Sequence, residues 1–450
     1  MTRVVVIGGD AAGMSAAAQA SRGAEPVELV VFEKGRFTSF AACGLPYFVG
    51  GLVHDSAKLV ARTPEQHRAN GIDVRIGEEV MSIDIERREV DVRVLEGGRT
   101  YREPFDHLVI ATGASPIRPP FENIDAHGIF GIQTIPDAVM IDEVIRARSP
   151  RRAVVVGGGY IGLEMVEALQ LRGLDVTVVE KLDQPMSTLD ADMGARVAEG
   201  LRALGVDLRL ATGVEGFERG ADGWVRAVAT AAGELPADLV VMGLGVRPNT
   251  RLAAEADIRI GPSGGIAVDA RMATAVDGVW AAGDCVESFH RVSQRPVSIA
   301  LGTHANKQGR VVGLNVSGSQ ARFPGVIGTA VTKVGTVEIG RTGLTEREAA
   351  SAGFDIVADT IEGTSRAHYY PDGAALSVKV VAERGTGRLL GAQIVGGADA
   401  AKRIDALAVA VWNEMSADEF GQLDLGYAPP FSPVWDATLI AARRTGERLR

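Results

Sequence analysis

The stretch that decides the fold lies near the N-terminus and reads VVVIGGDAAG, residues 4–13. Its β-branched run predicts a buried parallel strand, and the glycines after it predict a tight turn into a helix. A second apolar run, residues 27–32, ends in Glu33, about 20 residues beyond the last glycine. This order predicts a βαβ unit that binds a dinucleotide, with the pyrophosphate at the helix N-terminus and the ribose on the acid.

The same order recurs once, from VVVGGGYIG, residues 154–162, to Glu180 at the end of another apolar strand. Two such units in one chain predict two Rossmann-like domains. The first unit departs from the pattern, because Asp10 stands where a glycine is usual and would bring a carboxylate near the pyrophosphate. We expect Asp10 to point away from the phosphates or to cap the helix that follows.

Composition narrows the class of protein. The 450 residues exceed one ordinary core, so two or three domains are expected. A net charge of −10 without a run of Lys and Arg argues against nucleic acid as a partner. The lack of a charge-free apolar stretch of about 18 residues argues against a membrane span. The sequence enters a strand at once, without a signal peptide, and has only 2 cysteines. Both features favour a cytoplasmic location. No metal site is expected.

Further patterns complete the domain plan. The apolar runs at residues 108–113 and 239–245 end in small-residue turns and predict crossings between domains. From about residue 325 the chain alternates apolar and polar residues, which predicts an α+β region with an antiparallel sheet. The predicted fold class is therefore α/β, with two Rossmann-like domains and a C-terminal α+β domain. The predicted boundaries are 1–112 and 245–324 for a split first domain, 113–244 for an inserted second domain, and 325–450 for the last.

Cys43 is the candidate reactive residue. It lies in SFAACGLPY, residues 39–47, and the other cysteine of the chain, Cys285, lies in a different motif. The residues after Gly44 predict a helix, and a helix N-terminus lowers the pKa of a nearby thiol. We therefore interpret Cys43 as a redox centre whose partner is a small thiol or an oxygen from outside the chain; the alternative is a buried small hydrophobe. Cys285 is expected to be structural.

Together these motifs resemble the FAD-dependent pyridine nucleotide-disulfide oxidoreductases, and within them the single-cysteine coenzyme A-disulfide reductase branch. The specific segments are CGLPY, residues 43–47, and YAPPFS, residues 427–432. Ordinary members carry a second cysteine where this chain has Phe48. The resemblance implies a homodimer with a C-terminal dimerisation domain. It also implies electron transfer from a nicotinamide through FAD to Cys43, which alternates between a free thiolate and a mixed disulfide with a small molecule.

The resemblance also implies roles for individual residues. FAD is expected at Gly8, Gly9, Ala11, Ala12, Gly13, Glu33, Lys34, Ala111, Thr112, Gly113 and Asp284, and the nicotinamide cofactor at Gly157, Gly159, Tyr160, Ile161, Gly162 and Glu180. Coenzyme A, as substrate or mixed-disulfide partner, is expected at Ser15, Gln19, Arg22, Ser39 and His304, with Gln19 and Arg22 on one face of the first helix. The tyrosines that assist the thiol, one of them across the dimer interface, are expected to be Tyr427 and Tyr369, with Tyr370 as the alternative to the latter.

Departures from the branch leave the substrate open. Ala42 replaces a usual asparagine, a lysine expected near Asn70 is absent, and Trp435 stands where a lysine can occur. The phosphate-rich end of coenzyme A is then held weakly, and another disulfide, a persulfide or a polysulfide fits as well. Glu180 favours NADH because it repels a 2′-phosphate, while Lys181 keeps NADPH as the alternative.

Three other functions remain as alternatives. One is an NADH oxidase or peroxidase that cycles a sulfenic acid at Cys43, although such relatives carry a histidine at the place of Ala11. The second is a flavoprotein that passes electrons to another protein without thiol chemistry. The third is a redox-sensing flavoprotein with negligible turnover.

Overall fold

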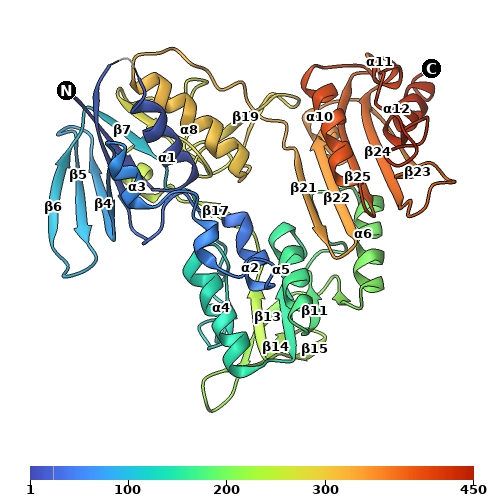
Figure 1. Ribbon diagram of the computed structural model, residues 1–450, viewed down its shortest axis with the longest axis horizontal. Helices are drawn as coiled ribbons and strands as arrows, with labels where there is room; N and C mark the ends of the chain where they lie inside the picture. Colours follow the sequence, from blue (N-terminus) through green and yellow to red (C-terminus); the bar gives the residue numbers. More distant parts are fainter. Residues whose placement is uncertain (24) are drawn as a thin grey trace.

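Two parallel sheets and one antiparallel sheet organise the computed structural model, which describes residues 1–23 and 25–450 (Figure 1). The first sheet is parallel throughout, and α1 and α8 lie side by side against it (Figure 1). Its elements, with the strands in spatial order, are β18 (Val279–Ala281), β7 (His107–Ile110), β1 (Thr2–Ile7), β2 (Val27–Glu33), β3 (Asp73–Ile76), α1 (Ala11–Ala20) and α8 (Gly302–Val316).

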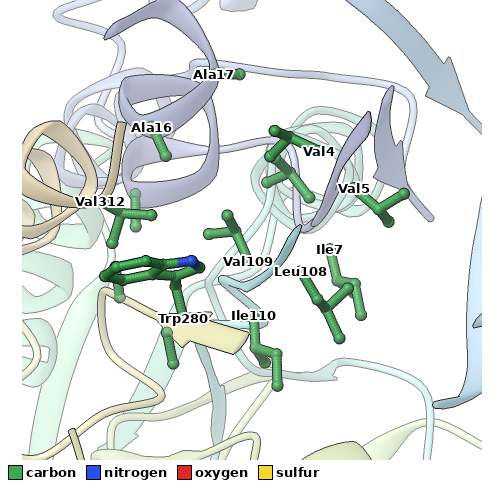
Figure 2. Close-up of a cluster of buried hydrophobic side chains, with 14 of the residues drawn as sticks. Val4, Val5, Ile7, Ala16, Ala17, Leu108, Val109, Ile110, Trp280 and Val312 are labelled. Carbon is green, nitrogen blue, oxygen red and sulfur yellow. The ribbon is translucent and has the colours of Figure 1, made fainter. Parts of the chain in front are cut away.

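The core of this lobe explains why its strands are apolar runs. In Figure 2 the side chains of Val109 from β7, Trp280 from β18 and Val312 from α8 lie together, and all three are buried. A strand covered on both faces must be apolar at every position, so the run at residues 4–7 forms β1. Gly309 and Gly313 let α8 approach α1 closely, since a Cβ at Gly309 would lie 2.1 Å from the carbonyl oxygen of Ala12.

The second sheet repeats this plan with shorter strands, all parallel. Its elements, with the strands in spatial order, are β12 (Asp207–Arg209), β11 (Asp175–Val179), β10 (Arg152–Val156), β16 (Leu239–Met242), β9 (Ile129–Phe130), α4 (Ile135–Arg148), α5 (Tyr160–Leu171) and α6 (Ala191–Ala203). The chain enters and leaves this lobe through an antiparallel pair, β8 (Ala114–Pro116) with β17 (Val246–Pro248). The chain therefore passes between the two parallel sheets at the places where the apolar runs end in small-residue turns.

The third sheet is antiparallel and belongs to the C-terminal lobe. Its elements, with the strands in spatial order, are β21 (Ala330–Val334), β22 (Val337–Gly343), β25 (Leu389–Gly396), β24 (Ala375–Glu383), β23 (Ile356–Thr364), α9 (Glu346–Ala352), α10 (Ile404–Trp412), α11 (Ala417–Gly421) and α12 (Ala437–Glu447). The predicted α/β fold class with a C-terminal α+β domain is confirmed.

Smaller elements complete the described chain. Antiparallel sheets formed by β4 to β6 and by β13 to β15 extend the first and second lobes. Their bounds and those of the remaining short elements are β4 (Glu78–Asp84), β5 (Glu89–Val94), β6 (Thr100–Pro104), β13 (Val214–Arg219), β14 (Val225–Thr230), β15 (Gly233–Pro236), β19 (Ser288–His290), β20 (Arg295–Val297), α2 (Leu45–Val49), α3 (Pro64–Ala69), α7 (Arg251–Glu255), η1 (Ala42–Gly44), η2 (Ser56–Leu59) and η3 (Ala401–Arg403). Within residues 1–23 and 25–450, no helix has the length and apolar character that crossing a membrane requires.

A buried lysine joins the second and third lobes. The side chain of Lys379 on β24 is 5% exposed and forms ion pairs with three carboxylates, those of Asp190, Asp192 and Glu346. Asp190 and Asp192 lie at the start of α6, whereas Glu346 opens α9. Burial lowers the pKa of Lys379, but its bonds to Asp192 and Glu346 more than offset this and raise the pKa overall. The lysine therefore stays charged and fixes α6 against the third sheet.

Candidate active site

The carboxyl ends of the first sheet bring the predicted FAD residues together. β1 leads into residues 8–13, which we call the first glycine turn, and β2 ends at Glu33. β7 leads into residues 111–113, and β18 is followed by the turn that carries Asp284. Carboxyl ends of neighbouring parallel strands meet at one edge of a sheet, which is where nucleotides bind in such folds. Lys34, next along the chain from Glu33, is exposed.

This edge fits the pyrophosphate and flavin of FAD. Within the described residues no side chain caps the N-terminus of α1, so its first amides remain available to an anion. A Cβ added at Gly113 or Gly302 would meet no atom within 4 Å, which indicates open space beside the sheet edge. Burial raises the pKa of Asp284, because little water reaches its carboxylate. A polar group of a bound ligand would take the place of that water.

The second sheet offers the equivalent site to a nicotinamide dinucleotide. Residues 157–162, the second glycine turn, follow β10 and open α5, whose N-terminus also has no side-chain cap in the described chain. A Cβ at Gly159 would meet nothing within 4 Å, so a phosphate has room to approach. Glu180 at the end of β11 accepts hydrogen bonds from the amides of Gly158 and Leu182, both through its side chain. The predicted residues Tyr160 and Ile161 lie in the first turn of α5.

Cys43 lies between these two sites. Residues 39–44, which we call the cysteine loop, leave the first lobe and end in η1, and α2 follows directly. Leu45 and Val49 of α2 are buried in the core of the second lobe, and Arg172 at the end of α5 donates to the carbonyl of Val49 at 2.7 Å. Figure 1 shows α2 beside α5, below the first lobe. Because α2 is anchored in the second lobe, the thiol lies where the first lobe meets α5.

The electrostatic surroundings of Cys43 differ from our expectation. The residue is exposed, yet the pKa of its thiol is raised, first by desolvation from surrounding protein and then by the negative charge of Glu164. The prediction that a helix N-terminus lowers this pKa is wrong for the chain alone. Cys43 precedes α2 within η1, and α2 has only 5 residues, so its dipole is outweighed by burial and by nearby carboxylates.

Glu164 was not found from the sequence, and it yields a first prediction. It lies on α5, where the Thr332 hydroxyl of β21 donates to its Oε1 at 3.2 Å. We expect Glu164→Gln to lower the pKa of Cys43, because it removes the carboxylate that contributes most to raising it. Alkylation of Cys43 by iodoacetamide at neutral pH should then become faster, since the thiolate is the reacting form.

A matched control is available one turn along α5. Glu167 pairs with Lys333 and is not among the charges that raise the pKa of Cys43. Glu167→Gln should therefore leave the alkylation rate unchanged. An unchanged or slower rate in Glu164→Gln would show that Glu164 does not control the thiol.

Asp10 does not cap α1, and its carboxylate contacts the cysteine loop instead. It stands at the N-cap position without a capping hydrogen bond, so the capping alternative is wrong. Its Oδ1 accepts a hydrogen bond from the amide of Phe40 at 3.1 Å, which ties the first glycine turn to the cysteine loop. Burial raises the pKa of Asp10 to about 6, and the charges of Glu33 and Asp284 add to this effect.

The predicted coenzyme A residues fall into two groups. Ser15 and Gln19 lie on the side of α1 that packs against α8, where the Ser15 hydroxyl donates to Asn306 at 2.8 Å, and His304 lies in the first turn of α8. Burial lowers the pKa of His304, which favours its neutral form. Arg22 corrects our expectation: α1 ends at Ala20, so Arg22 lies in the turn after the helix. That turn is held by the bond from its amide to the carbonyl of Gln19.

Ser39 of the cysteine loop has a partner that the sequence did not predict. Its hydroxyl lies 3.0 Å from Nε2 of His67, a buried histidine on α3. Burial lowers the pKa of His67, so its ring is neutral and accepts or donates one hydrogen bond here. The sequence carries no local signal for this pair, because the two residues lie 28 positions apart.

The candidate tyrosines lie together on the C-terminal lobe. Tyr369 and Tyr427 are 65% and 47% exposed, and a hydrogen bond that the Tyr427 hydroxyl donates to Tyr369 is the first cause of the raised pKa of Tyr427. Tyr370 instead lies 6.0 Å from the guanidinium of Arg366. The structure thus brings together the pair that the motifs singled out. The segment that follows Tyr427 also exposes Phe431 and Trp435, an apolar surface of the kind found at subunit interfaces.

Comparison with known proteins agrees with this geometry. The family model described as pyridine nucleotide-disulphide oxidoreductase matches residues 2–309, and the model of its dimerisation domain matches residues 329–438. The chain is 41% identical to the "NAD(P)H sulfur oxidoreductase (CoA-dependent)" of Pyrococcus abyssi, covering 98% of this chain and 97% of the relative. It is 35% identical to an "NADH oxidase" of Methanocaldococcus jannaschii, covering 99% of each.

A solved structure shows the same arrangement of lobes. The NAD-dependent persulfide reductase from A. fulgidus superimposes with a TM-score of 0.96 at 38% identity, covering 99% of this chain and 83% of that one. The matches span both parallel sheets, the cysteine loop between them and the C-terminal lobe. As its motifs predicted, the chain is therefore an oxidoreductase that belongs to the pyridine nucleotide-disulphide oxidoreductase family.

Proposed function

We propose that this protein is an FAD-dependent NAD(P)H oxidoreductase that reduces a low-molecular-weight disulfide or persulfide, coenzyme A disulfide or a related compound, through Cys43 alone. The observation that carries the proposal is the position of the cysteine loop. Asp10 binds it from the first glycine turn, and α2 anchors it against α5 of the second lobe. Cys43 is exposed, whereas Cys285 is buried and leaves no second sulfur for an internal disulfide.

The chemistry assigned to the chain is thiol–disulfide exchange. The thiolate of Cys43 attacks one sulfur of the substrate, a Cys43–sulfur bond forms, and the first thiolate leaves. When bound, FAD and NAD(P)H supply the electron pair that cleaves a disulfide. Cleavage of the mixed disulfide releases the second thiol and restores Cys43. The amides of the two glycine turns hold the pyrophosphates, and Glu33 and Glu180 bind the riboses.

Ligand selection is assigned to polar residues of α1 and α8 and of the cysteine loop. Ser15 and Gln19 lie where these helices meet, and His304 lies in the first turn of α8. We assign Ser39 of the cysteine loop to the same ligand. The name of the Pyrococcus relative supports a coenzyme A compound as the ligand. Ala42 stands where the resembled branch usually has an asparagine, and Trp435 where it can have a lysine. Both differences favour a substrate whose phosphates contribute little binding energy. Persulfides and polysulfides therefore stay candidates.

The functional unit is proposed to be a homodimer in which two phenols assist the thiol, one of them supplied by the neighbouring subunit. Tyr369 and Tyr427 lie close enough for Tyr369 to raise the pKa of the Tyr427 phenol, and both side chains are exposed. A phenol donates a hydrogen bond to a leaving thiolate and stabilises it. Sedimentation should give a dimer, and a fully active monomer would reject this assembly.

One steady-state experiment tests the proposed function. NADH and NADPH consumption is measured with coenzyme A disulfide, coenzyme A persulfide, glutathione disulfide, cystine and oxygen as acceptors. We expect turnover with a coenzyme A compound to exceed turnover with oxygen, and a lower KM for NADH than for NADPH because of Glu180. Fast oxygen consumption with inert disulfides would instead support the second candidate, an NADH oxidase, which the Methanocaldococcus relative favours.

A further inference from the structure

The two glycine turns form the same set of backbone hydrogen bonds, each with its own partners. Gly8 and Gly157 have φ of +109° and +105°, and their amides donate to the strand-end carbonyls of Phe32 and Val179, each at 2.8 Å. The next amides donate to Glu33 and Glu180 respectively, again each at 2.8 Å. The following carbonyls accept from the amides of Ser39 and Met186, two residues with φ of 48° and 50°. One copy therefore serves as an internal reference for the other.

The copies differ at the third position of the turn. Asp10 and Gly159 adopt the same extended backbone, with φ of −111° and −85°. In the second turn a Cβ at Gly159 would meet nothing within 4 Å. In the first turn the side chain of Asp10 reaches the amide of Phe40, the residue directly after Ser39. The second turn folds without an acid, so Asp10 is not needed to build the turn.

In the described chain, several hydrogen bonds hold the start of the cysteine loop, and Asp10 is the one acidic side chain that takes part in them. The amides of Ser39 and Ala41 donate to the carbonyls of Gly9 and Leu59, and the Ser39 carbonyl accepts from Ala61. The bond of the Ser39 hydroxyl to His67 involves a neutral ring. A hydrogen bond to a carboxylate is stronger than these neutral bonds, and it changes when the acid titrates.

We propose that Asp10 is a positioning residue that fastens the cysteine loop to the first glycine turn and couples its own protonation to the reactivity of Cys43. The ligand that acts on this coupling is the anionic dinucleotide at the N-terminus of α1, because its negative charge raises the pKa of Asp10. The inference rests on the proposed role of Cys43, but its test measures the thiol directly and needs no turnover.

The charges around Asp10 set the direction of this coupling. The acids that face it are Glu33 from the end of β2 and Asp284 from the turn after β18, and Cys43 lies on the loop that it binds. Burial, with these acids, raises the pKa of Asp10 to about 6, and the negative charge of a bound pyrophosphate acts in the same direction. Above this pH Asp10 is ionised, holds Phe40 more strongly and helps to raise the pKa of Cys43. Below it, both effects fade.

Two substitutions separate the hydrogen bond from the charge. Asp10→Asn keeps an oxygen that accepts from the amide of Phe40 but removes the charge. Asp10→Gly reproduces the second turn and removes both. The measurements, made on the flavin-loaded dimer, are the iodoacetamide alkylation rate of Cys43 between pH 5 and 9 and amide hydrogen exchange over residues 38–48, with flavin content from absorbance as a check on folding.

The expected results differ between the two variants. In the wild type the alkylation profile should show an inflection besides that of the thiol, at or above about pH 6, because the bound pyrophosphate raises the pKa of Asp10 further. Both variants should lose this inflection and react faster at neutral pH. Asp10→Gly should exchange the Phe40 amide about tenfold faster, because it loses one charge-assisted bond, and Asp10→Asn should do so by a smaller factor, because it keeps a neutral acceptor.

Other outcomes overturn the proposal. Unchanged exchange in Asp10→Gly would show that the carboxylate does not hold the loop, and a retained inflection in Asp10→Asn would show that another group titrates. If Asp10→Gly does not bind flavin, Asp10→Asn decides alone. It must lose the inflection and exchange the Phe40 amide less than about tenfold faster than the wild type. Glu164→Gln is the comparison, because it neutralises an acid that faces Cys43 but does not bind the loop. It should keep both the inflection and the exchange rates.

If the proposed function fails and the inference about Asp10 holds, turnover with disulfides is absent but the alkylation and exchange results are unchanged. An oxidase, for example, would show no turnover with disulfides while the alkylation and exchange results stand.

Discussion

Cys43→Ser is expected to lower NAD(P)H-driven disulfide reduction by at least about 10³-fold, the scale found when a nucleophile is removed. A serine hydroxyl does not ionise near neutral pH and forms no bond to sulfur that an electron pair could cleave. Flavin content should stay unchanged, because the side chain lies in η1, outside both glycine turns. The measurement is thiol released per NADH consumed with a coenzyme A disulfide.

The matched control is Cys285→Ser. This cysteine is fully buried beside the carbonyls of Ala282 and Ile110, so its loss should affect stability more than turnover. Equal loss of turnover in both variants would show that position 43 has no special role. Retention of full turnover in Cys43→Ser would favour an electron-transferring flavoprotein without thiol chemistry.

Lys379→Met is expected to lower the free energy of unfolding by about 3 kcal/mol or more, because it leaves partly buried carboxylates without their counter-ion. Asp190 is only 10% exposed at its side chain, and it also accepts a hydrogen bond from Gln393 at 2.6 Å. Removing the cation places three negative charges, those of Asp190, Asp192 and Glu346, around an apolar side chain. The contact between α6 and the third sheet should then loosen first.

Urea denaturation followed by tryptophan fluorescence measures this change, with Lys333→Met as the control. Lys333 pairs with Glu167, but its side chain is 42% exposed, so its loss should cost less than about 1 kcal/mol. Equal costs for the two lysines would show that the buried cluster does not join the lobes. A cost at Lys379 that vanishes at low pH would agree with it, since protonated carboxyls no longer need the cation.

Local patterns were sufficient to predict the architecture. The runs at residues 4–13 and 154–162, each followed by an acid at the end of the next strand, predicted both parallel sheets, because glycine turns and β-branched runs act within a few residues. The alternation after residue 325 predicted the antiparallel sheet for the same reason. Cys43 was a candidate from its motif alone. The roles assigned to the site residues, and the domain boundaries, stay predictions.

Interactions between distant segments were not predictable. Asp10 was expected to point away from the phosphates or to cap its own helix; the cap is absent, and its carboxylate binds the amide of Phe40, 30 residues away. The pKa of Cys43 was expected to be lowered by the helix beside it, but burial and Glu164, from another lobe, raise it. Lys379 carries no sequence signal, since its partner Asp192 lies 187 residues earlier.

The amino-acid order by itself determined where strands, turns and helices form and which residue types stand at the strand ends, because those choices depend on backbone sterics and local burial. Only the tertiary structure decided the charge environment of the thiol, the partner of Asp10 and the junction at Lys379. Electrostatic energies depend on distance and on exclusion of water, and both are set when separate lobes pack against one another.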